Sequence, residues 1–223
     1  MTLVIAHRGA SAYEPENSLA AFRRAVELSA DGVELDVHET ADGALVVVHD
    51  AALDGHLIRD LPLERVRRHR LSNGEPVPTL DEALAALGDT ALAFIEVKAL
   101  SRTGDAALFG VIDGGPAPHR ARVHSFDHRI VLRLRAARPD VPVGVLSVSY
   151  PIDPVAQVRA ARAQALWQQR DLIDVPLVEQ VHAADCAVYA WTVDDPAHMR
   201  LLRDCGVDGI CTNRPDTARE ALR

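Results

Sequence analysis

Cysteine is scarce in this chain of 223 residues, which contains only three: Cys186, Cys205 and Cys211. The number is odd, and no two of them stand in C-x-x-C spacing. A framework of disulfides, typical of small secreted domains, is therefore excluded. We expect reduced thiols and a cytoplasmic protein.

Excess basic charge and long apolar runs are also lacking. The chain has 24 Lys and Arg against 32 Asp and Glu, a net charge of −8, whereas nucleic-acid binding usually needs a clustered basic surface. No stretch is long and apolar enough to span a bilayer. The first apolar run, Leu3–Ala6, is too short for a signal peptide. We expect no nucleic-acid partner and no stable membrane insertion, whereas a few placed cations or a metal would suffice to hold a small anionic substrate.

The sequence does contain a regular alternation of short β-branched runs and longer amphipathic stretches. Eight strand-then-helix units indicate a parallel sheet, and eight strands close a barrel. We therefore predict an α/β protein with a single (β/α)₈ barrel domain over residues 1–223. Strands are expected at Leu3–Ala6, Val33–Val37, Leu92–Val97, Ala121–His124, Val143–Leu146, Ala165–Trp167, Ala187–Trp191 and Gly209–Thr212. Helices are expected at 18–29, 79–87, 102–112, 127–138, 153–162, 175–184, 195–204 and 215–222.

One segment interrupts this alternation after the second strand. Ala44–Val48 indicates an extra strand, and residues 50–78 form a polar insertion with a short helix near 62–69. Residues suited to cap helix N-termini precede several helices. They are Asn17, Thr79, Asp127, Asp153 and Asp194.

Three carboxylates lie near the carboxyl ends of the second and third predicted strands, where barrel active sites are built. Glu34 and Asp36 are two residues apart and so share one face of a strand, and Glu96 stands in the next strand of the barrel. Together they would repel one another strongly unless a cation lay between them. An all-oxygen shell favours a hard divalent ion, Mg²⁺ or Ca²⁺. The alternative is an ion pair of the carboxylates with Lys98.

The residues around the carboxylates suit a phosphodiester. Arg8 and Lys98 could hold the non-bridging oxygens, although Arg8 could instead cap a helix or face solvent. His7 and His49 could divide the proton transfers, because imidazole titrates near neutrality. A single histidine at a strand end is more often structural. The hypothesis therefore rests on these groups meeting at one end of the barrel.

These residues belong to motifs that run along most of the chain. The most specific are His7-Arg8-Gly9, Pro15-Glu16-Asn17-Ser18, Gly32–Val37, His49-Asp50 and Glu96-Val97-Lys98, with Ser125-Phe126-Asp127, Ala190–Val193 and Val207–Ile210 following. In this order they resemble the glycerophosphodiester phosphodiesterase family.

The resemblance implies hydrolysis of a glycerophosphodiester, a small-molecule substrate, to glycerol 3-phosphate and an alcohol. It implies His7 and His49 as the acid/base pair, and Glu34, Asp36 and Glu96 as ligands of Mg²⁺ or Ca²⁺. Arg8 and Lys98 would lie near the phosphate, and Trp191 would line the glycerol pocket. Asn17 is interpreted as the cap of the first helix.

The sequence departs from the family pattern after His49-Asp50, at His124, and at Thr212–Pro215, so the leaving alcohol is left open. Lysophospholipase D activity or a cyclising phosphodiesterase would use the same residues. A catalytically silent phosphate-binding barrel would be expected to lack one of them. His38 is expected to face away from Asp36, and His124 ends a strand at the mouth without an assigned role. The oligomeric state is not indicated.

Overall fold

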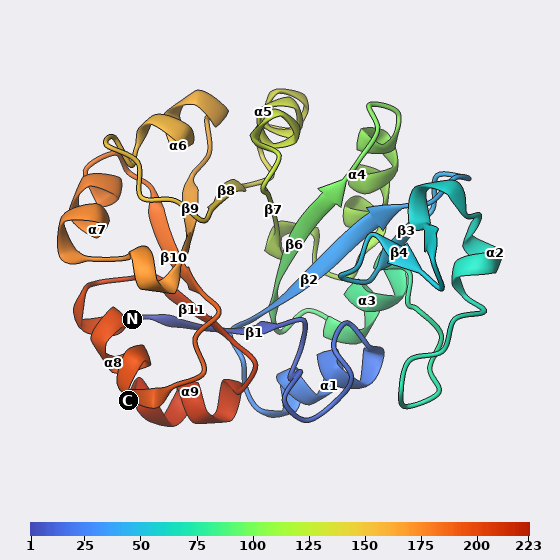
Figure 1. Ribbon diagram of the computed structural model, residues 1–223, viewed down its shortest axis with the longest axis horizontal. Coiled ribbons are helices and arrows are strands. Elements are labelled where there is room, and N and C mark those ends of the chain that lie inside the picture. Colours follow the sequence, from blue (N-terminus) through green and yellow to red (C-terminus); the bar gives the residue numbers. More distant parts are fainter.

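A computed structural model describes all 223 residues. Eight parallel strands form a ring that closes between β1 and β2, with the order β1-β11-β10-β9-β8-β7-β6-β2 (Figure 1). The predicted (β/α)₈ barrel is confirmed. Its strands are β1 (Leu3–His7), β2 (Gly32–Glu39), β6 (Leu92–Ala99), β7 (Ala121–Ser125), β8 (Val143–Ser147), β9 (Ala165–Gln169), β10 (Ala187–Trp191) and β11 (Gly209–Thr212).

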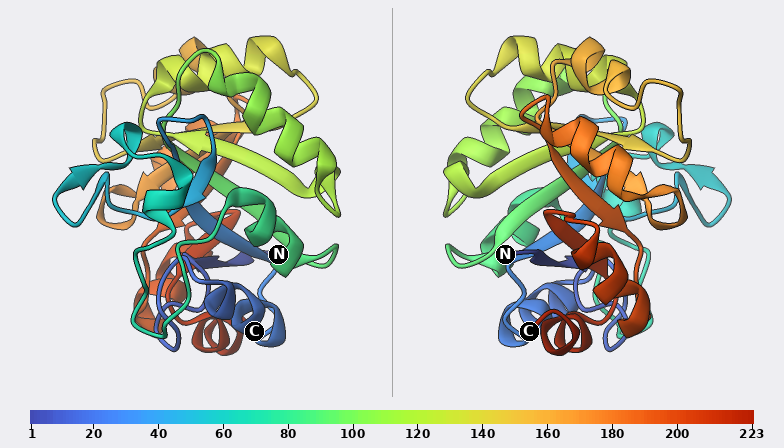
Figure 2. Two further views of the ribbon diagram at one scale, coloured as in Figure 1. Left: turned by 90° about the vertical axis from the view of Figure 1, so that its right-hand side faces the viewer. Right: turned by 90° about the vertical axis from the view of Figure 1, so that its left-hand side faces the viewer.

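Helices surround the barrel on its outer face (Figure 2). The outward side chains of the strands pack against them in one large cluster of 46 buried residues. Burial of this layer is the main source of stability, because each buried aliphatic side chain contributes about 1.5–3 kcal/mol. The helices are α1 (Leu19–Glu27), α3 (Leu80–Leu87), α4 (Gly104–Gly114), α5 (His128–Ala137), α6 (Ala156–Ala161), α7 (Val175–His182), α8 (Pro196–Asp204) and α9 (Pro215–Ala221). No helix is long and apolar enough to cross a membrane.

Three of the five predicted helix caps, Asn17, Asp153 and Asp194, are wrong. The residue before α6 is Val155, although Asp153 Oδ1 accepts hydrogen bonds from the backbone N–H groups of Val155 and Ala156. Thr79 and Asp127 cap α3 and α5 as expected. Helix α1 is instead capped by Ser18, whose Oγ accepts a hydrogen bond from a backbone N–H of the first turn. Helix α8 is capped by Asp195, the residue after Asp194. The displaced Asn17 and Asp194 have hydrogen bonds at the mouth of the barrel.

An aromatic layer fills the inside of the barrel near the middle of the strands. Trp167 packs edge-on against Phe94, with ring centroids 5.2 Å apart, and its ring is tilted against that of Tyr189, with centroids 4.9 Å apart. Each ring faces a glycine of a neighbouring strand, where a Cβ atom would lie within 3.0 Å of the ring. These glycines are Gly32 (against Phe94), Gly144 (against Trp167) and Gly209 (against Tyr189).

The predicted insertion projects from the rim of the barrel (Figure 2). It contains β3 (Leu45–Val47), which pairs antiparallel with β2, the hairpin of β4 (Ala52–Leu53) and β5 (His56–Leu57), the 3₁₀ helix η1 (Ile58–Asp60) and α2 (Leu63–Val66). A small apolar cluster that includes Val46, Ile58 and Val66 holds it together. This cluster fixes the segment that carries His49. The 3₁₀ helices η2 (Pro118–Arg120) and η3 (Arg170–Leu172) complete the elements.

Candidate active site

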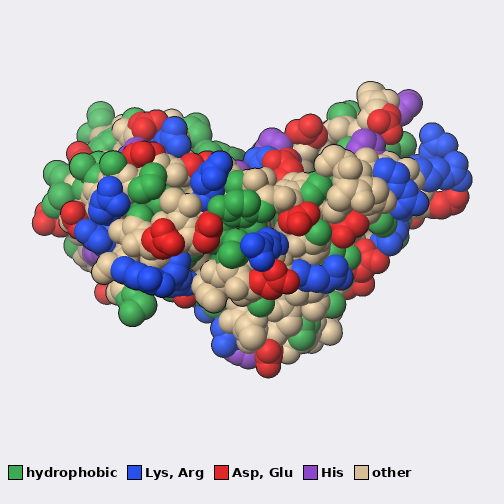
Figure 3. All heavy atoms as spheres, turned by 90° about the horizontal axis from the view of Figure 1, so that it is seen from below, with side chains coloured by type: hydrophobic (Ala, Val, Ile, Leu, Met, Phe, Trp, Pro, Cys, Tyr) green, Lys and Arg blue, Asp and Glu red, His purple; other side chains and the backbone are tan.

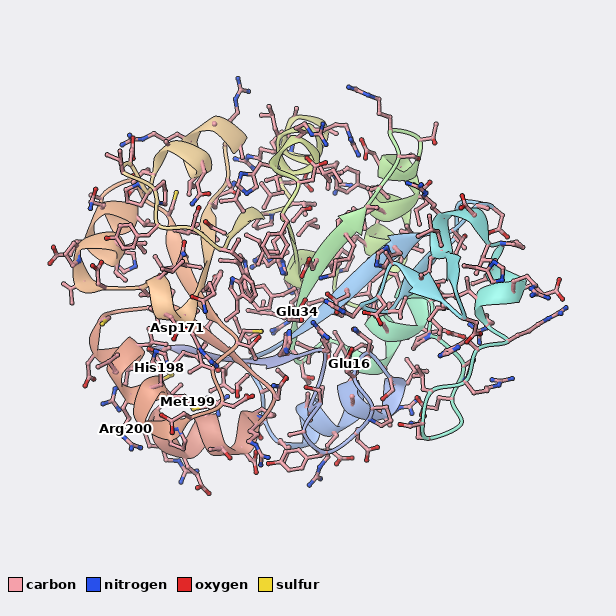
Figure 4. The ribbon with its side chains drawn as sticks, in the orientation of Figure 1. Glu16, Glu34, Asp171, His198, Met199 and Arg200 are labelled. Atoms are coloured by element: carbon pink, nitrogen blue, oxygen red, sulfur yellow. The ribbon has the colours of Figure 1, made fainter.

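The sequence-predicted residues meet at the carboxyl ends of the barrel strands. Glu34 lies where β1, β2 and β6 come together, and Glu16 lies nearby on the loop before α1 (Figure 4). The surface of the molecule has a deep notch flanked by two lobes, with basic, acidic and histidine side chains along one flank (Figure 3).

Asp36 is the most completely neutralised carboxylate of the site. Its oxygens lie 2.9 Å from Lys98 Nζ and 3.1 Å from Arg8 Nε, and Asn17 Nδ2 donates a hydrogen bond to it at 2.8 Å. Burial alone would raise the pKa of Asp36, but the charges of Lys98 and Arg8 outweigh burial and lower it below its usual value. Asp36 is therefore ionised, and the Lys98 ion pair considered from the sequence is present.

Asn17 adopts a left-handed conformation with φ of 57°. This conformation turns its amide towards β2, where Oδ1 accepts a hydrogen bond from the Asp36 backbone N–H at 3.3 Å. In the motif Pro15-Glu16-Asn17-Ser18, Asn17 thus binds Asp36 in the site and the adjacent Ser18 caps α1. The interpretation of Asn17 as a helix cap is therefore corrected.

Arg8 is held between two carboxylates rather than facing solvent or capping a helix. In addition to Asp36, its Nη1 donates to both oxygens of Glu16 at 2.9 Å. Its backbone N–H donates to Glu34 Oε2 at 3.2 Å. The Arg8 side chain is 17% exposed and Glu16 is half exposed, so part of the guanidinium can be reached by a ligand at the mouth.

Glu34 and Glu96 lie in a different environment from Asp36. Glu34 is 2% exposed, and its Oε1 has no hydrogen-bond partner. Burial, followed by the charges of Asp36 and Glu96, raises the pKa of Glu34 well above its ordinary value. Burial likewise raises the pKa of Glu96 to about 7, although Lys98 Nζ lies 2.7 Å from its Oε1. A bound cation would stabilise the ionised form of both groups.

His124 joins these two glutamates, a position that the sequence left without a role. One ligand atom from each of Glu34, Glu96 and His124 lies within 4.8 Å of the others. Burial lowers the pKa of His124 to about 3, so the imidazole is neutral at physiological pH. The three side chains could hold a metal ion, because two carboxylates and a neutral imidazole are all metal ligands. The cavity beside them measures about 20 Å³, enough for a water molecule or an ion.

His7 is fixed by a chain of hydrogen bonds through Asn213, the residue that follows β11. Asn213 Nδ2 donates to Asp194 at 2.6 Å, which orients the amide so that its Oδ1 faces His7 Nδ1 at 2.8 Å. Because an amide oxygen only accepts, Nδ1 carries the proton. The other ring nitrogen, Nε2, is left without a proton, 4.0 Å from Glu34 Oε2. Burial, followed by the charge of Arg8, lowers the pKa of His7.

His49 lies in the segment after β3 and lines a pocket with Lys98. Its Nδ1 is 2.9 Å from Asp50 Oδ1, and its side chain is 38% exposed. A larger pocket of about 510 Å³ is lined by His49, Lys98 and His38. The expectation that His38 faces away from Asp36 is wrong, because His38 lines this pocket together with Lys98, whose ammonium is paired with Asp36. His38 Nε2 contacts the backbone oxygen of His49 at 3.1 Å.

Trp191 ends β10 and lines the same small cavity as His7, Glu34 and Glu96. Its ring packs edge-on against Phe126 at 5.5 Å, and its indole Nε1 is buried without a hydrogen-bond partner. The indole N–H thus remains available to a ligand.

Comparisons with known proteins agree with this arrangement. The sequence model described as Glycerophosphoryl diester phosphodiesterase family matches residues 7–217. A glycerophosphodiester phosphodiesterase of Caldanaerobacter subterraneus is 34% identical over 238 residues, which cover 100% of this chain and 98% of that protein. The crystal structure of a glycerophosphodiester phosphodiesterase from Parabacteroides distasonis has a TM-score of 0.90 at 28% identity, covering 99% of this chain and 96% of the other. An Oleispira antarctica phosphodiesterase in complex with the product sn-glycerol-3-phosphate has a TM-score of 0.91 at 26% identity, covering 100% and 97%.

Proposed function

Since the chain belongs to the glycerophosphoryl diester phosphodiesterase family and is a phosphodiesterase, we propose that it hydrolyses glycerophosphodiesters to glycerol 3-phosphate and an alcohol with a divalent cation. The observation that carries the proposal is that two buried carboxylates with raised pKa values, Glu34 and Glu96, lie beside Arg8, Lys98 and His7. The product bound by the Oleispira relative supports the same assignment.

The substrate phosphate is held by Arg8 and Lys98. Both cations are already fixed by Asp36, which lowers the entropy lost when they bind an anion. The glycerol group lies against Trp191, whose buried N–H has no partner in the protein. The alcohol that leaves lies towards the larger pocket lined by His38 and His49.

His7 is the general base and His49 the general acid. Nε2 of His7 has a free lone pair, because Asn213 fixes the proton on Nδ1. It accepts the proton of the attacking hydroxyl group while that oxygen forms a bond to phosphorus. Attack by water gives glycerol 3-phosphate directly, whereas attack by a glycerol hydroxyl gives a cyclic phosphate that water must then open. The bond between phosphorus and the alcohol oxygen breaks, and His49 donates a proton to that oxygen.

Glu34 and Glu96 supply carboxylate oxygens to the metal site and His124 adjoins them, whereas Asp36, the third ligand that the resemblance implies, is paired with Lys98 and Arg8. The donor set fits a divalent cation, because Glu34 Oε1 is buried and unpartnered. When bound there, a divalent ion would neutralise negative charge on the non-bridging phosphate oxygens. The sequence-based expectation of Mg²⁺ or Ca²⁺ stays a prediction, as do the cytoplasmic localisation and the roles of individual residues.

A substrate panel tests the proposal. Metal-free protein should be inactive on glycerophosphocholine, glycerophosphoethanolamine and glycerophosphoglycerol, and added divalent cation should restore release of glycerol 3-phosphate. Lysophospholipids serve as the comparison. Full activity after chelation would overturn the metal dependence. If lysophospholipids are turned over faster than every glycerophosphodiester, the protein is a lysophospholipase D rather than a glycerophosphodiester phosphodiesterase.

A further inference from the structure

The imidazole of His124 is enclosed without any hydrogen bond. The residue is 1% exposed, and its buried Nδ1 has no partner. Its Nε2 lies 4.0 Å from Glu34 Oε1, too far for a hydrogen bond. Buried polar groups are nearly always paired, so an imidazole that lacks partners at both nitrogens needs another explanation.

The position of His124 is fixed by its neighbours. It pairs with Glu96 in the register of β6 and β7, so the two side chains stand next to each other on adjacent strands. Its ring stacks on Trp167 with centroids 4.2 Å apart and planes only 6° from parallel. The ring is therefore held rigidly beside the two glutamates.

The other histidine of the cavity has a different arrangement. His7 also lies 4.0 Å from Glu34, but its Nδ1 is bound to Asn213. It also lies outside the group whose ligand atoms all meet within 4.8 Å. Of the two histidines, only His124 has no hydrogen bond at either ring nitrogen. Only His124 also lies close enough to Glu34 and Glu96 for all three to bind the same ion.

We propose that His124 is a nitrogen ligand of the metal, so that the site selects a borderline ion such as Zn²⁺ over Ca²⁺ or Mg²⁺. Imidazole suits Zn²⁺ and the later first-row ions, whereas Ca²⁺ and Mg²⁺ take oxygen ligands. Two carboxylates and one imidazole also leave coordination positions open for substrate, as in catalytic zinc sites. The inference rests on the proposed metal site, but it is tested by binding alone.

Affinities of the metal-free protein test the selectivity. Zn²⁺ is titrated against a chromophoric chelator, and Ca²⁺ against bound Tb³⁺ luminescence, for wild type and His124→Gln. We expect the variant to lose at least about 10-fold in Zn²⁺ affinity, the scale on which ligand-supporting contacts act, and less than about 3-fold in Ca²⁺ affinity, because oxygen ligands remain. His38→Gln is the matched control, a buried histidine outside the cluster, and should change neither. Equal Zn²⁺ affinity in wild type and His124→Gln overturns the proposal.

Spectroscopy on the unmutated protein gives a second test that does not depend on the folding of a variant. Mn²⁺-loaded protein should show the electron spin-echo modulation of a coordinated ¹⁴N, replaced by ¹⁵N modulation when only histidine is isotopically labelled. Absence of nitrogen modulation overturns the proposal, as does modulation that persists in a folded His124→Gln protein. If the protein shows a nitrogen ligand but hydrolyses no glycerophosphodiester, this inference holds and the proposed function is wrong.

Discussion

Glu34 and Asp36 carry the same functional group two residues apart on one strand, yet their surroundings shift their pKa values in opposite directions. Asp36 has Lys98 and Arg8 against its two oxygens. Glu34 has a buried oxygen with no partner and two anionic neighbours. The protein thus supplies the cations for one carboxylate and leaves the other for a ligand.

Replacement of Arg8 tests whether its guanidinium binds the phosphate. We expect Arg8→Ala to lower kcat/KM by about 10²–10³-fold, the usual cost of removing one charge-stabilising donor, and to leave the fold intact. Arg24→Ala is the control, because Arg24 is an exposed arginine paired with Glu27 on α1. Wild-type kinetics for Arg8→Ala would show that this arginine only holds Glu16 and Asp36 together.

The two histidines are tested by substitution and by the leaving group. His7→Ala and His49→Ala should each lower kcat by about 10²–10⁴-fold. A nitrophenyl phosphodiester, whose leaving group hardly needs a proton, should restore much of the rate of His49→Ala and none of that of His7→Ala. Rescue of His7→Ala instead would exchange the two roles. A loss below tenfold in both variants contradicts the paired mechanism.

Single residues also mark the limit of what the sequence could predict. Glu34, Asp36, Glu96 and Lys98 could be placed at one mouth, because each stands near the end of a recognisable strand. The involvement of His124 depends on the neighbouring strand and on the absence of hydrogen-bond partners, which no local pattern reveals. The link from Asp194 through Asn213 to His7 joins residues about 200 positions apart.

At the scale of elements, every predicted barrel strand and every surrounding helix is present within a few residues of its predicted bounds. Apolar runs and amphipathic stretches reflect which residues are buried. Because this pattern repeats along the chain, strands and helices can be predicted from the sequence. The first residue of a helix depends on local hydrogen bonds that compete with tertiary ones. Asn17 and Asp194 suit caps chemically, but each bonds across the barrel mouth.

The cap of α5 gives a pH-dependent prediction. A hydrogen bond from Arg129, opposed by slight burial, lowers the pKa of Asp127 to about 2. Because the folded pKa is below that of the unfolded chain, the stabilisation is complete above about pH 4 and is lost as the pH falls towards 2. We expect at most about 1 kcal/mol, since Arg129 is 91% exposed.

Asp127→Asn isolates this charge, because asparagine caps a helix as well as aspartate does. The difference in free energy of unfolding between wild type and variant, from urea titrations, should be constant from pH 7 to 5 and smaller at pH 3. A difference that stays unchanged down to pH 3 would contradict the charge-based account.

At the scale of the whole molecule, the aromatic layer of Phe94, Trp167 and Tyr189 supports the site from below. Trp167 stacks under His124 on one side and borders a cavity of about 200 Å³ at the amino ends of the strands on the other. The glycines opposite these rings are therefore packing positions that act on the site through the tryptophan.

Gly144→Ala tests this packing. The added Cβ would lie 2.9 Å from Trp167 Cδ1, and overpacking of this kind costs about 1–3 kcal/mol. We expect a fall in Tm of about 2–4 °C for each kcal/mol lost. Gly110→Ala in α4 is the matched control, because its Cβ meets nothing within 4 Å, and it should stabilise the protein by about 0.5–1 kcal/mol. A neutral Gly144→Ala would mean that the ring moves freely.

The aromatic layer also fills the barrel below the site. Substrate must therefore enter, and both products must leave, at the carboxyl ends of the strands. The two products must leave one after the other through the same opening that the substrate uses. If Arg8 and Lys98 hold the phosphate at the carboxyl ends of the strands, as proposed, the alcohol departs first and glycerol 3-phosphate last. In initial-rate measurements, glycerol 3-phosphate should compete with the diester, whereas the free alcohol should inhibit noncompetitively. Competitive inhibition by the alcohol alone would reverse that order of departure.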